Sequence, residues 1–162
     1  MNKLFAFFLL VFLSPLFLIV SLIIFLELGR PLFLKQERSG IKGTKINLIK
    51  FRTMKGKDRA ILDSTDFYSR TTFLTRLLRR MKLDEIPQLL NIMEGSLNFI
   101  GPRSLPFSYI NENALPEKYW GIRSSVKPGI TGLAQTLEYD HRYPRRRMAA
   151  DIIYVRKKKV GV

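Results

Sequence analysis

The sequence predicts an α+β fold in which a membrane segment precedes a small, mostly helical domain. Two observations lead to this class: an almost uninterrupted apolar run at the N-terminus, and after it a strand-like alternation that gives way to helical spacing of apolar residues. We therefore place a re-entrant membrane helix-break-helix hairpin at residues 1–28. Residues 29–162 are expected to form a cytosolic, membrane-associated domain with a short β-hairpin and interfacial amphipathic helices.

The apolar run extends from Leu4 to Leu26 and is broken by Ser14-Pro15. At 1.5 Å per residue, about 23 helical residues extend about 34 Å, which is enough to cross a bilayer. Proline removes a helical hydrogen bond and clashes with the preceding turn, so a bend is expected at this break. By residue pattern alone, a kinked helix that spans the membrane explains the segment.

The charges on either side favour a different topology. Lys3 precedes the segment, and Arg30 and Lys35 follow it. Because Lys and Arg prefer the cytoplasmic side, both flanks would lie on the same face of the membrane. Each half-helix, of about 10 to 14 residues, is too short to span alone. A hairpin that bends at Ser14-Pro15 and leaves on the face where it entered satisfies both flanks.

The next residues predict a β-hairpin and then a basic helix. Residues 29–54 alternate apolar and polar side chains around glycines 40 and 43, so they predict a strand, a turn and a second strand. Residues 55–69 are polar and predict a loop or a short helix. The apolar spacing over residues 70–81 predicts a helix with arginines on its other face, which suits either solvent or contact with a membrane or phosphate.

Further helices are expected in the second half of the chain. One should begin near Asp84, which would be its N-cap, and end at Gly95. A short buried strand or turn should then lead into a Gly-Pro-Arg loop at residues 101–103. Residues 107–135 predict one short helix, and residues 145–159 predict a last helix.

Composition narrows the function. The chain has 162 residues, with 28 Lys and Arg against 13 acids, and a formal net charge of +15. This balance favours a polyanionic partner: nucleic acid, anionic lipid or a phosphorylated substrate. The chain has no cysteine and one histidine, which excludes a Cys-based zinc site and disfavours a Ser/His triad or a His-rich metal site. Carboxylates are the better candidates for catalysis.

Two adjacent acids, Asp84 and Glu85, follow Arg79 and Lys82 at the expected helix entrance. Three explanations stay open. The acids could cap the helix, they could bind Mg²⁺ together with substrate phosphates, or Asp84 could attack phosphorus as a nucleophile. Nearby cations and a helix N-terminus are expected to keep Asp84 ionised and to bind approaching phosphates. This context favours phosphoryl chemistry over capping alone.

Four motifs carry a resemblance to a known family: "KFRTM" at residues 50–54, "LDEIPQLLN" at 83–91, "GSLNFIGPR" at 95–103 and "KPGITGLAQ" at 127–135. In this order and approximate spacing they resemble the bacterial sugar transferase family, the monotopic polyprenyl-phosphate phosphoglycosyl transferases. "GRPLFLKQERSG" and the broken N-terminal segment are similar too. The resemblance covers nearly the whole chain and is strongest to the small, single-domain members.

This resemblance implies an enzyme that transfers a sugar 1-phosphate from a UDP-sugar to a polyprenyl phosphate such as undecaprenyl phosphate, with release of UMP. It implies a ping-pong route through a covalent aspartyl-phosphosugar intermediate, with Mg²⁺. The expected place is the cytoplasmic face of the bacterial inner membrane, at the first membrane step of surface polysaccharide or glycoprotein glycan synthesis. Membrane lipids are expected partners and nucleic acid is not; downstream glycosyltransferases and a homo-oligomer stay open.

The resemblance also implies site residues. Asp84 is the expected nucleophile, and Glu85 its partner in metal binding or in deprotonation of the acceptor, so both are expected metal ligands. Ser14 and Pro15 match the helix break that makes the membrane segment re-entrant. The residues expected to bind phosphate or nucleotide, or to support that binding, are Arg79, Lys50, Arg52, Arg103, Lys127 and Asp151.

Three features depart from the family pattern. Ser104 follows the Gly-Pro-Arg where proline is frequent, and Met81-Lys82 stands where a small residue such as serine is common. The chain also ends soon after its tyrosine-containing helix, where members usually continue, so a truncated C-terminus is expected to weaken membrane grip or activity. Two alternatives follow: an inactive truncated member, and a non-enzymatic membrane-tethered basic module that binds anionic lipid or nucleic acid. The second does not explain the acids, and no recognisable nucleic-acid motif is present.

Overall fold

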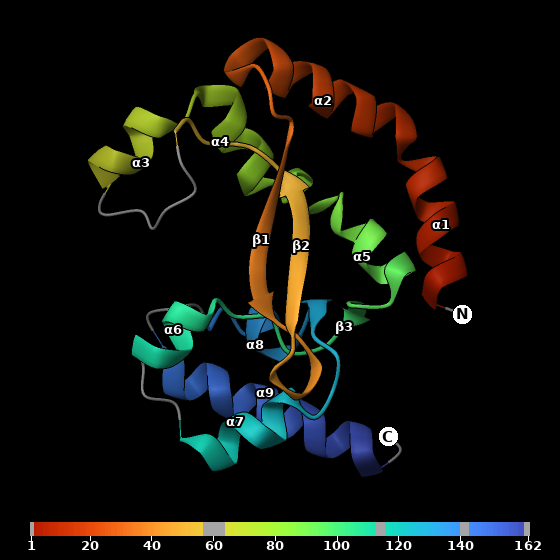
Figure 1. Cartoon of the computed structure of the whole chain (residues 1–162), viewed down its shortest axis with the longest axis vertical. Coiled ribbons are helices and arrows are strands. Elements are labelled where there is room, and N and C mark those ends of the chain that lie inside the picture. The colour runs from red at the N-terminus through yellow and green to blue at the C-terminus, as the bar shows by residue number, and fades with distance from the viewer. Residues whose placement is uncertain (1, 57–63, 113–115, 140–142, 161–162) are drawn as a thin grey trace.

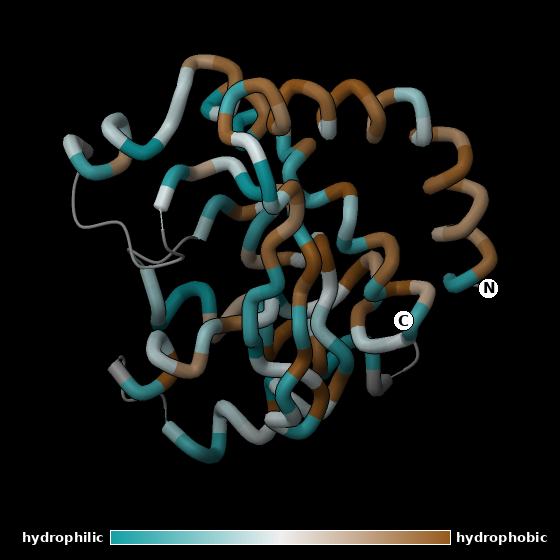
Figure 2. The backbone as a smooth tube through the Cα atoms, turned by 45° about the horizontal axis from the view of Figure 1, so that its top comes forward, coloured by the Kyte–Doolittle hydropathy of each residue, from teal (hydrophilic) through white to brown (hydrophobic). Residues whose placement is uncertain are grey.

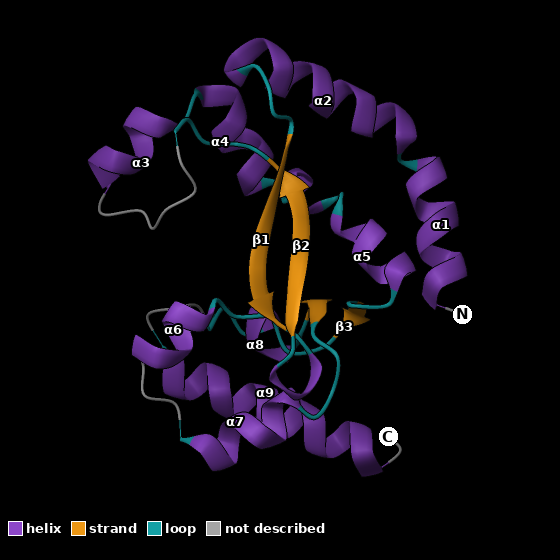
Figure 3. Cartoon of the chain, viewed as in Figure 1, coloured by secondary structure: helices purple, strands orange, loops and turns teal. Residues whose placement is uncertain are grey.

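Helices and two small β-sheets build the chain, so the predicted α+β class is confirmed (Figures 1 and 3). The computed structural model describes residues 2–56, 64–112, 116–139 and 143–160. In chain order the elements are α1 (Asn2–Phe12), α2 (Ser14–Leu28), β1 (Phe33–Ser39), η1 (Ile41–Gly43), β2 (Lys45–Phe51), α3 (Ser64–Arg70), α4 (Phe73–Arg80), η2 (Leu83–Glu85), α5 (Gln88–Glu94), β3 (Asn98–Ile100), α6 (Phe107–Glu112), α7 (Glu117–Ser124), β4 (Gly129–Thr131), α8 (Leu133–Thr136) and α9 (Pro144–Val160).

The N-terminal segment is broken where the sequence predicts it. α1 and α2 meet at Leu13 with a bend of 63°, and Pro15 lies in the first turn of α2. Within the described residues, no single helix combines the length and the apolar character needed to cross a bilayer. α1 and α2 meet both criteria only when taken together across the bend. Such a pair fits a broken span and a re-entrant loop alike, so the re-entrant topology stays a prediction.

Only one side of this segment packs against the rest of the chain. Ala6 of α1 is buried in a core with residues of β2 and α5, and Val20 and Ile24 of α2 are buried in a second core with residues of β2 and α4. The outer side is apolar too: Phe12 is 80% exposed and Leu26 is 73% exposed. Figure 2 shows both helices as mostly hydrophobic along their length. Exposing this apolar outer side to water is energetically unfavourable.

The predicted β-hairpin is confirmed. β1 and β2 pair antiparallel, with Phe33 opposite Phe51, and the hairpin joins the α2 end of the molecule to the α9 end (Figure 1). A buried asparagine fixes the hairpin to α5: the amide nitrogen of Ile49 donates to Asn91 Oδ1 at 2.9 Å, and Asn91 Nδ2 donates to the carbonyl of Asn47 at 2.9 Å. These bonds orient the start of α5, and therefore the acids that precede it.

A second sheet, which the sequence did not predict, holds the Gly-Pro-Arg loop. β3 and β4 pair in parallel, with Asn98 opposite Gly129. The strands approach so closely that a Cβ atom at Gly129 would lie 2.2 Å from the amide nitrogen of Gly101. Glycine is therefore required there for packing rather than for an unusual backbone angle. This pairing fixes the backbone that carries Arg103.

Several predicted boundaries were wrong. The helix expected at residues 70–81 is present as α4 but begins three residues later, because Thr72 forms a capping box at its start. The short helix expected as one alternative within residues 55–69 is present as α3. Asp84 is not the N-cap of a helix: it lies inside the short turn η2, and α5 begins after Pro87. Residues 107–135 hold three short helices instead of one. The last helix is confirmed as α9, and residues 57–63 of the expected loop lie outside the described residues.

Candidate active site

The acid pair is placed by a sharp reversal of the chain after α4. Lys82 adopts a left-handed backbone conformation, with φ 60° and ψ 18°, which costs a non-glycine residue on the order of 1 kcal/mol. The reversal turns Asp84 inward, where it is only 7% exposed. A lysine held in this conformation next to a buried acid is typical of a functional site more than of a simple connection.

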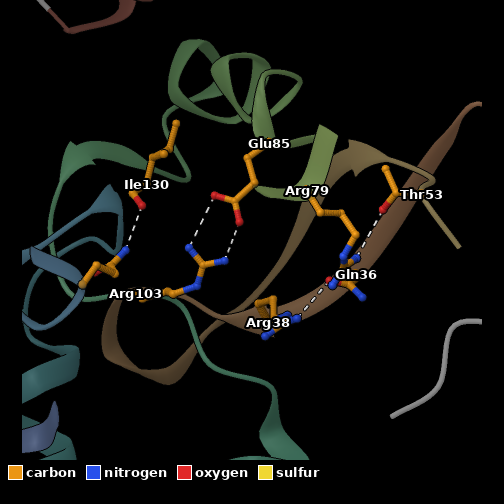
Figure 4. Close-up of polar contacts among 8 residues, drawn as sticks. Gln36, Arg38, Thr53, Arg79, Glu85, Arg103 and Ile130 are labelled. Carbon is orange, nitrogen blue, oxygen red and sulfur yellow. Dashed lines mark hydrogen bonds and ion pairs between the residues drawn. The ribbon is translucent and has the colours of Figure 1, made fainter. Parts of the chain in front are cut away.

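Glu85 is held by an arginine fork. Arg103 Nη2 donates to Glu85 Oε1 at 2.5 Å, and Arg103 Nη1 donates to Oε2 at 3.4 Å (Figure 4). Burial alone would raise the pKa of Glu85, but the hydrogen bonds and charge of Arg103, with Lys82 and Lys50, bring this pKa below its usual value. Glu85 is therefore a fixed anion and a weak base, which argues against the predicted role in deprotonating the acceptor.

Asp84 is in the opposite state. Its carboxylate forms no hydrogen bond or ion pair with any of the described residues. Burial, followed by the charge of Glu85, raises its pKa above the usual value, against the opposing charges of Arg79, Lys50 and Lys82. The nearby cations oppose this rise but do not cancel it, and the sequence, which shows the cations, does not show the burial. A more basic, unengaged carboxylate oxygen is a better nucleophile than one saturated with donors.

A small basic hollow of about 40 Å³ lies near Asp84. Lys50, Arg52 and Arg79 line it, together with Thr53, whose hydroxyl accepts a hydrogen bond from Arg79 Nη1 at 3.2 Å (Figure 4). Lys50 and Arg79 also act electrostatically on Asp84. This hollow therefore places positive charge within reach of a phosphate that approaches the nucleophile.

A separate, larger cavity of about 800 Å³ lies beside Glu85. Lys82, Glu85 and Arg103 line it near the acid pair, and Leu9 and Leu13 of α1 line it at the break of the membrane segment. The residues around the acid pair therefore border both a basic hollow and a cavity that reaches the apolar helices.

The structure gathers some of the predicted phosphate-binding residues around the acids and not others. Arg79, Lys50 and Arg103 surround the pair. Arg52 borders the hollow, but its Nη2 donates to the carbonyls of residues 28 and 29, so it also ties β2 to the end of α2. Lys127 is exposed, lies near Gly95 at the end of α5, and lines neither space.

Asp151 does not face either space. It is 1% exposed, and its Oδ2 accepts a hydrogen bond from Arg123 Nε at 2.7 Å. Arg123 Nη2 also donates to the carbonyl of Arg103. Burial raises the pKa of Asp151, while Arg123 and Arg147 oppose that rise. Asp151 therefore supports the loop of Arg103 and is placed too deep to touch a substrate.

Arg123 and Arg147 are the residues that the sequence did not reveal. Arg123 lies in α7 outside the four motifs, and Arg147 is one of three consecutive arginines that suggest only a solvated basic run. The one sequence feature that could have pointed to Arg123 is Asp151, the lone acid in an otherwise basic helix. A carboxylate that is buried requires a cationic partner, and Arg123 is that partner.

The acid pair fits Mg²⁺ only together with a substrate. Among the described ranges, no group of three or more His, Cys, Asp or Glu side chains could hold a metal ion. Mg²⁺ commonly takes one or two carboxylates and completes its shell with water and substrate phosphates. The unengaged oxygens of Asp84 suit this, and the more weakly held Glu85 Oε2 could join them.

The chain matches one protein family and several known proteins over most of its length. The profile of the bacterial sugar transferase family matches residues 1–162. The chain is 39% identical over 130 residues to the uncharacterized sugar transferase EpsL of Bacillus subtilis (80% of this chain, 63% of the relative). It is 34% identical over 155 residues to the UDP-glucose:undecaprenyl-phosphate glucose-1-phosphate transferase of Caulobacter vibrioides (88% and 56%). It is 33% identical over 156 residues to the exopolysaccharide production protein PSS of Rhizobium leguminosarum bv. phaseoli (88% and 77%).

The chain therefore spans less than two thirds of the length of the first two of these relatives. The match to the family covers every residue of the chain, including the acid pair and the Gly-Pro-Arg loop. The chain belongs to the bacterial sugar transferase family.

Proposed function

We propose that the chain transfers a sugar 1-phosphate from a UDP-sugar to undecaprenyl phosphate, with release of UMP. Membership of the family supports this, as do the names of two relatives. The Caulobacter vibrioides protein is named for transfer of glucose 1-phosphate from UDP-glucose, and the Aeromonas hydrophila protein for transfer from UDP-N-acetylgalactosamine. The identity of the sugar is not part of the proposal.

The observation that carries the proposal is the contrast between two adjacent carboxylates. Glu85 is held by the guanidinium of Arg103, whereas Asp84 is buried, has no hydrogen-bond partner among the described residues, and is more basic than an ordinary aspartate. An Asp84 oxygen attacks the phosphorus that carries the sugar, and the bond from that phosphorus to the bridging oxygen breaks. UMP leaves with the bonding electrons and an aspartyl-phosphosugar remains. An oxygen of the acceptor phosphate then attacks the same phosphorus and frees the Asp84 carboxylate.

The surrounding residues supply position and charge, which dominate catalysis of phosphoryl transfer. Arg79 and Lys50 would bind phosphate oxygens on the side of the hollow. Arg103 would hold Glu85 so that Asp84 faces the substrate. Asp84 and Glu85 would bind Mg²⁺ jointly with the diphosphate, and the ion would offset the negative charge that gathers on the departing phosphate.

We place this reaction at the cytoplasmic face of the bacterial inner membrane. The outer sides of α1 and α2 are apolar, and α4 adds Phe73, 71% exposed, and Met81, 58% exposed, near its ends. Lys3 Nζ donates to the carbonyl of Glu94 at 3.3 Å, so the start of α1 lies against the same domain that follows α2. This contact supports a re-entrant segment whose two ends share one face.

The topology can be tested with a single cysteine. The chain has none, so Asn2→Cys supplies a unique thiol at the start of α1. We expect a membrane-impermeant maleimide to label this thiol in inverted vesicles and not in intact spheroplasts. Asn111→Cys, at an exposed position of α6, is the control for sidedness. Labelling of position 2 from outside spheroplasts would show that the segment spans the membrane.

The function can be tested by following UMP. Detergent-solubilised protein is mixed with one UDP-sugar at a time, undecaprenyl phosphate and Mg²⁺. We expect UMP release with at least one UDP-sugar, and a loss of at least about tenfold when EDTA removes the ion. Boiled protein gives the background. If every common UDP-sugar fails, the chain is an inactive member of the family and the proposal is wrong.

A further inference from the structure

The larger cavity beside Glu85 is lined by two chemically different kinds of side chain. Leu9 and Leu13 of α1 and Leu89 of α5 form an apolar part of the lining at the break of the membrane segment. Arg103 and Arg147 also line this cavity of about 800 Å³. A space lined by both apolar side chains and arginines suits a ligand that joins an anionic group to an apolar chain.

Arg147 is a cation of the cavity lining that no described acid engages directly. Its guanidinium forms no hydrogen bond or ion pair within the described part of the chain, although its side chain is partly buried in α9. The guanidinium instead lies over the ring of Tyr109 in a cation–π contact, 5.8 Å from the ring centroid. By contrast, Arg146 and Arg145 on the same helix are exposed.

The charges around Arg147 leave an excess of one cation. Arg103 is paired with Glu85 and Arg123 with Asp151. The cavity lining adds one further cation, Lys82, and one further acid, Glu138, so the charge of Arg147 is left over. Burial, followed by the charge of Arg123, lowers the pKa of Arg147, while Asp151 and Tyr109 oppose that change. A guanidinium that is partly desolvated beside two like charges gains most from an anion that enters the cavity.

We propose that Arg147 binds the phosphate of the polyprenyl phosphate acceptor in this cavity. The inference rests on the proposed function and assigns the acceptor to this cavity. Leu9 and Leu13 of the lining belong to α1, so a polyprenyl chain bound there would leave along the membrane segment. Lys50 and Arg79, which border the separate basic hollow and act electrostatically on Asp84, are left to bind the diphosphate of the UDP-sugar.

The test compares the Michaelis constants of the two substrates. Full-length protein in detergent is assayed by UMP release, with undecaprenyl phosphate varied at saturating UDP-sugar and then the reverse. Arg147→Gln is expected to raise the KM for undecaprenyl phosphate about tenfold or more, as for loss of a hydrogen bond to a charged group, and to change the KM for UDP-sugar less than about twofold. Arg147→Lys, which keeps the charge but not the fork, should recover part of the loss.

The matched control is Arg145→Gln, which removes the same charge from an exposed position two residues away and should change neither constant. A rise confined to the KM for UDP-sugar would assign Arg147 to the nucleotide and overturn the proposal. Unchanged constants in Arg147→Gln would overturn it as well. If Arg147→Gln does not fold, the same split measured on Arg147→Lys decides. A wild-type protein that releases no UMP overturns the proposed function first, and this inference with it.

Discussion

Asp84→Asn is expected to abolish UMP release, with a loss of at least about 10⁴-fold, because the amide cannot serve as the attacking group. The structure makes the loss specific to this residue. The adjacent carboxylate cannot replace it, since both oxygens of Glu85 accept hydrogen bonds from Arg103. Intact-mass spectrometry of wild-type protein incubated with UDP-sugar alone should show a phosphosugar adduct that Asp84→Asn lacks.

The same substitution should not harm the fold. Because burial raises the pKa of Asp84, the folded chain holds this proton more tightly than the unfolded chain, whose aspartate pKa is near 3.9. The stability of the wild-type protein therefore falls as the pH rises from the pKa of Asp84 in the unfolded chain through its pKa in the folded chain. Asparagine does not ionise, so the variant does not lose this stability. We expect the melting temperature of Asp84→Asn to equal or exceed that of wild type at pH 7. The difference should shrink toward zero below about pH 4.

Glu117→Gln is the control for Asp84→Asn. It removes one negative charge from an exposed position at the start of α7 and should leave both activity and melting temperature unchanged. Turnover by Asp84→Asn above about one per cent of wild type would remove Asp84 from the nucleophile role. An inactive variant that melts well below wild type would show instead that the carboxylate stabilises the fold, contrary to its raised pKa.

The structural features that could be predicted from the sequence are those set by residues close together in the chain. The break at Ser14-Pro15, the β-hairpin and the acid pair all follow from short local patterns, and each is present in the structure. Asp84 shows where such inference ends. Its flanking cations are visible in the sequence, but its burial depends on how Lys82 turns the chain. The direction of its pKa shift therefore required the fold.

Residues that meet over long separations were missed. Arg123 and Asp151 are 28 positions apart, and Asn98 pairs with Gly129 across 31 positions. The short strand before the Gly-Pro-Arg loop was one of the two expected forms and is present as β3. Its partner β4 has only three residues, too few to show alternation, so the parallel pairing that holds Arg103 left no periodic signal. The glycines of "KPGITG" and "GPR" were visible as motif letters, and the close approach of Gly129 to Gly101 gives their physical reason.

Asp151→Ala is expected to destabilise the protein by about 3–5 kcal/mol, because it leaves the charge of Arg123 buried without its carboxylate. The side chains of this pair are 4% and 1% exposed, so water cannot replace the lost partner. Denaturant or thermal unfolding in detergent measures the change. Glu37→Ala is the matched control, since it breaks an ion pair with Lys45 that is 53% and 72% exposed and should cost less than about 1 kcal/mol.

A double substitution separates stability from support of the site. Asp151→Leu with Arg123→Met replaces the buried pair by apolar side chains of similar length, which is often neutral for stability, so most of the loss should be recovered. UMP release should stay at least about tenfold low, because the carbonyl of Arg103 loses the donor that Arg123 supplied and the fork on Glu85 is no longer fixed. If activity returned along with stability, the pair would serve only to hold the fold together. An Asp151→Ala variant no less stable than Glu37→Ala would contradict the buried ion pair itself.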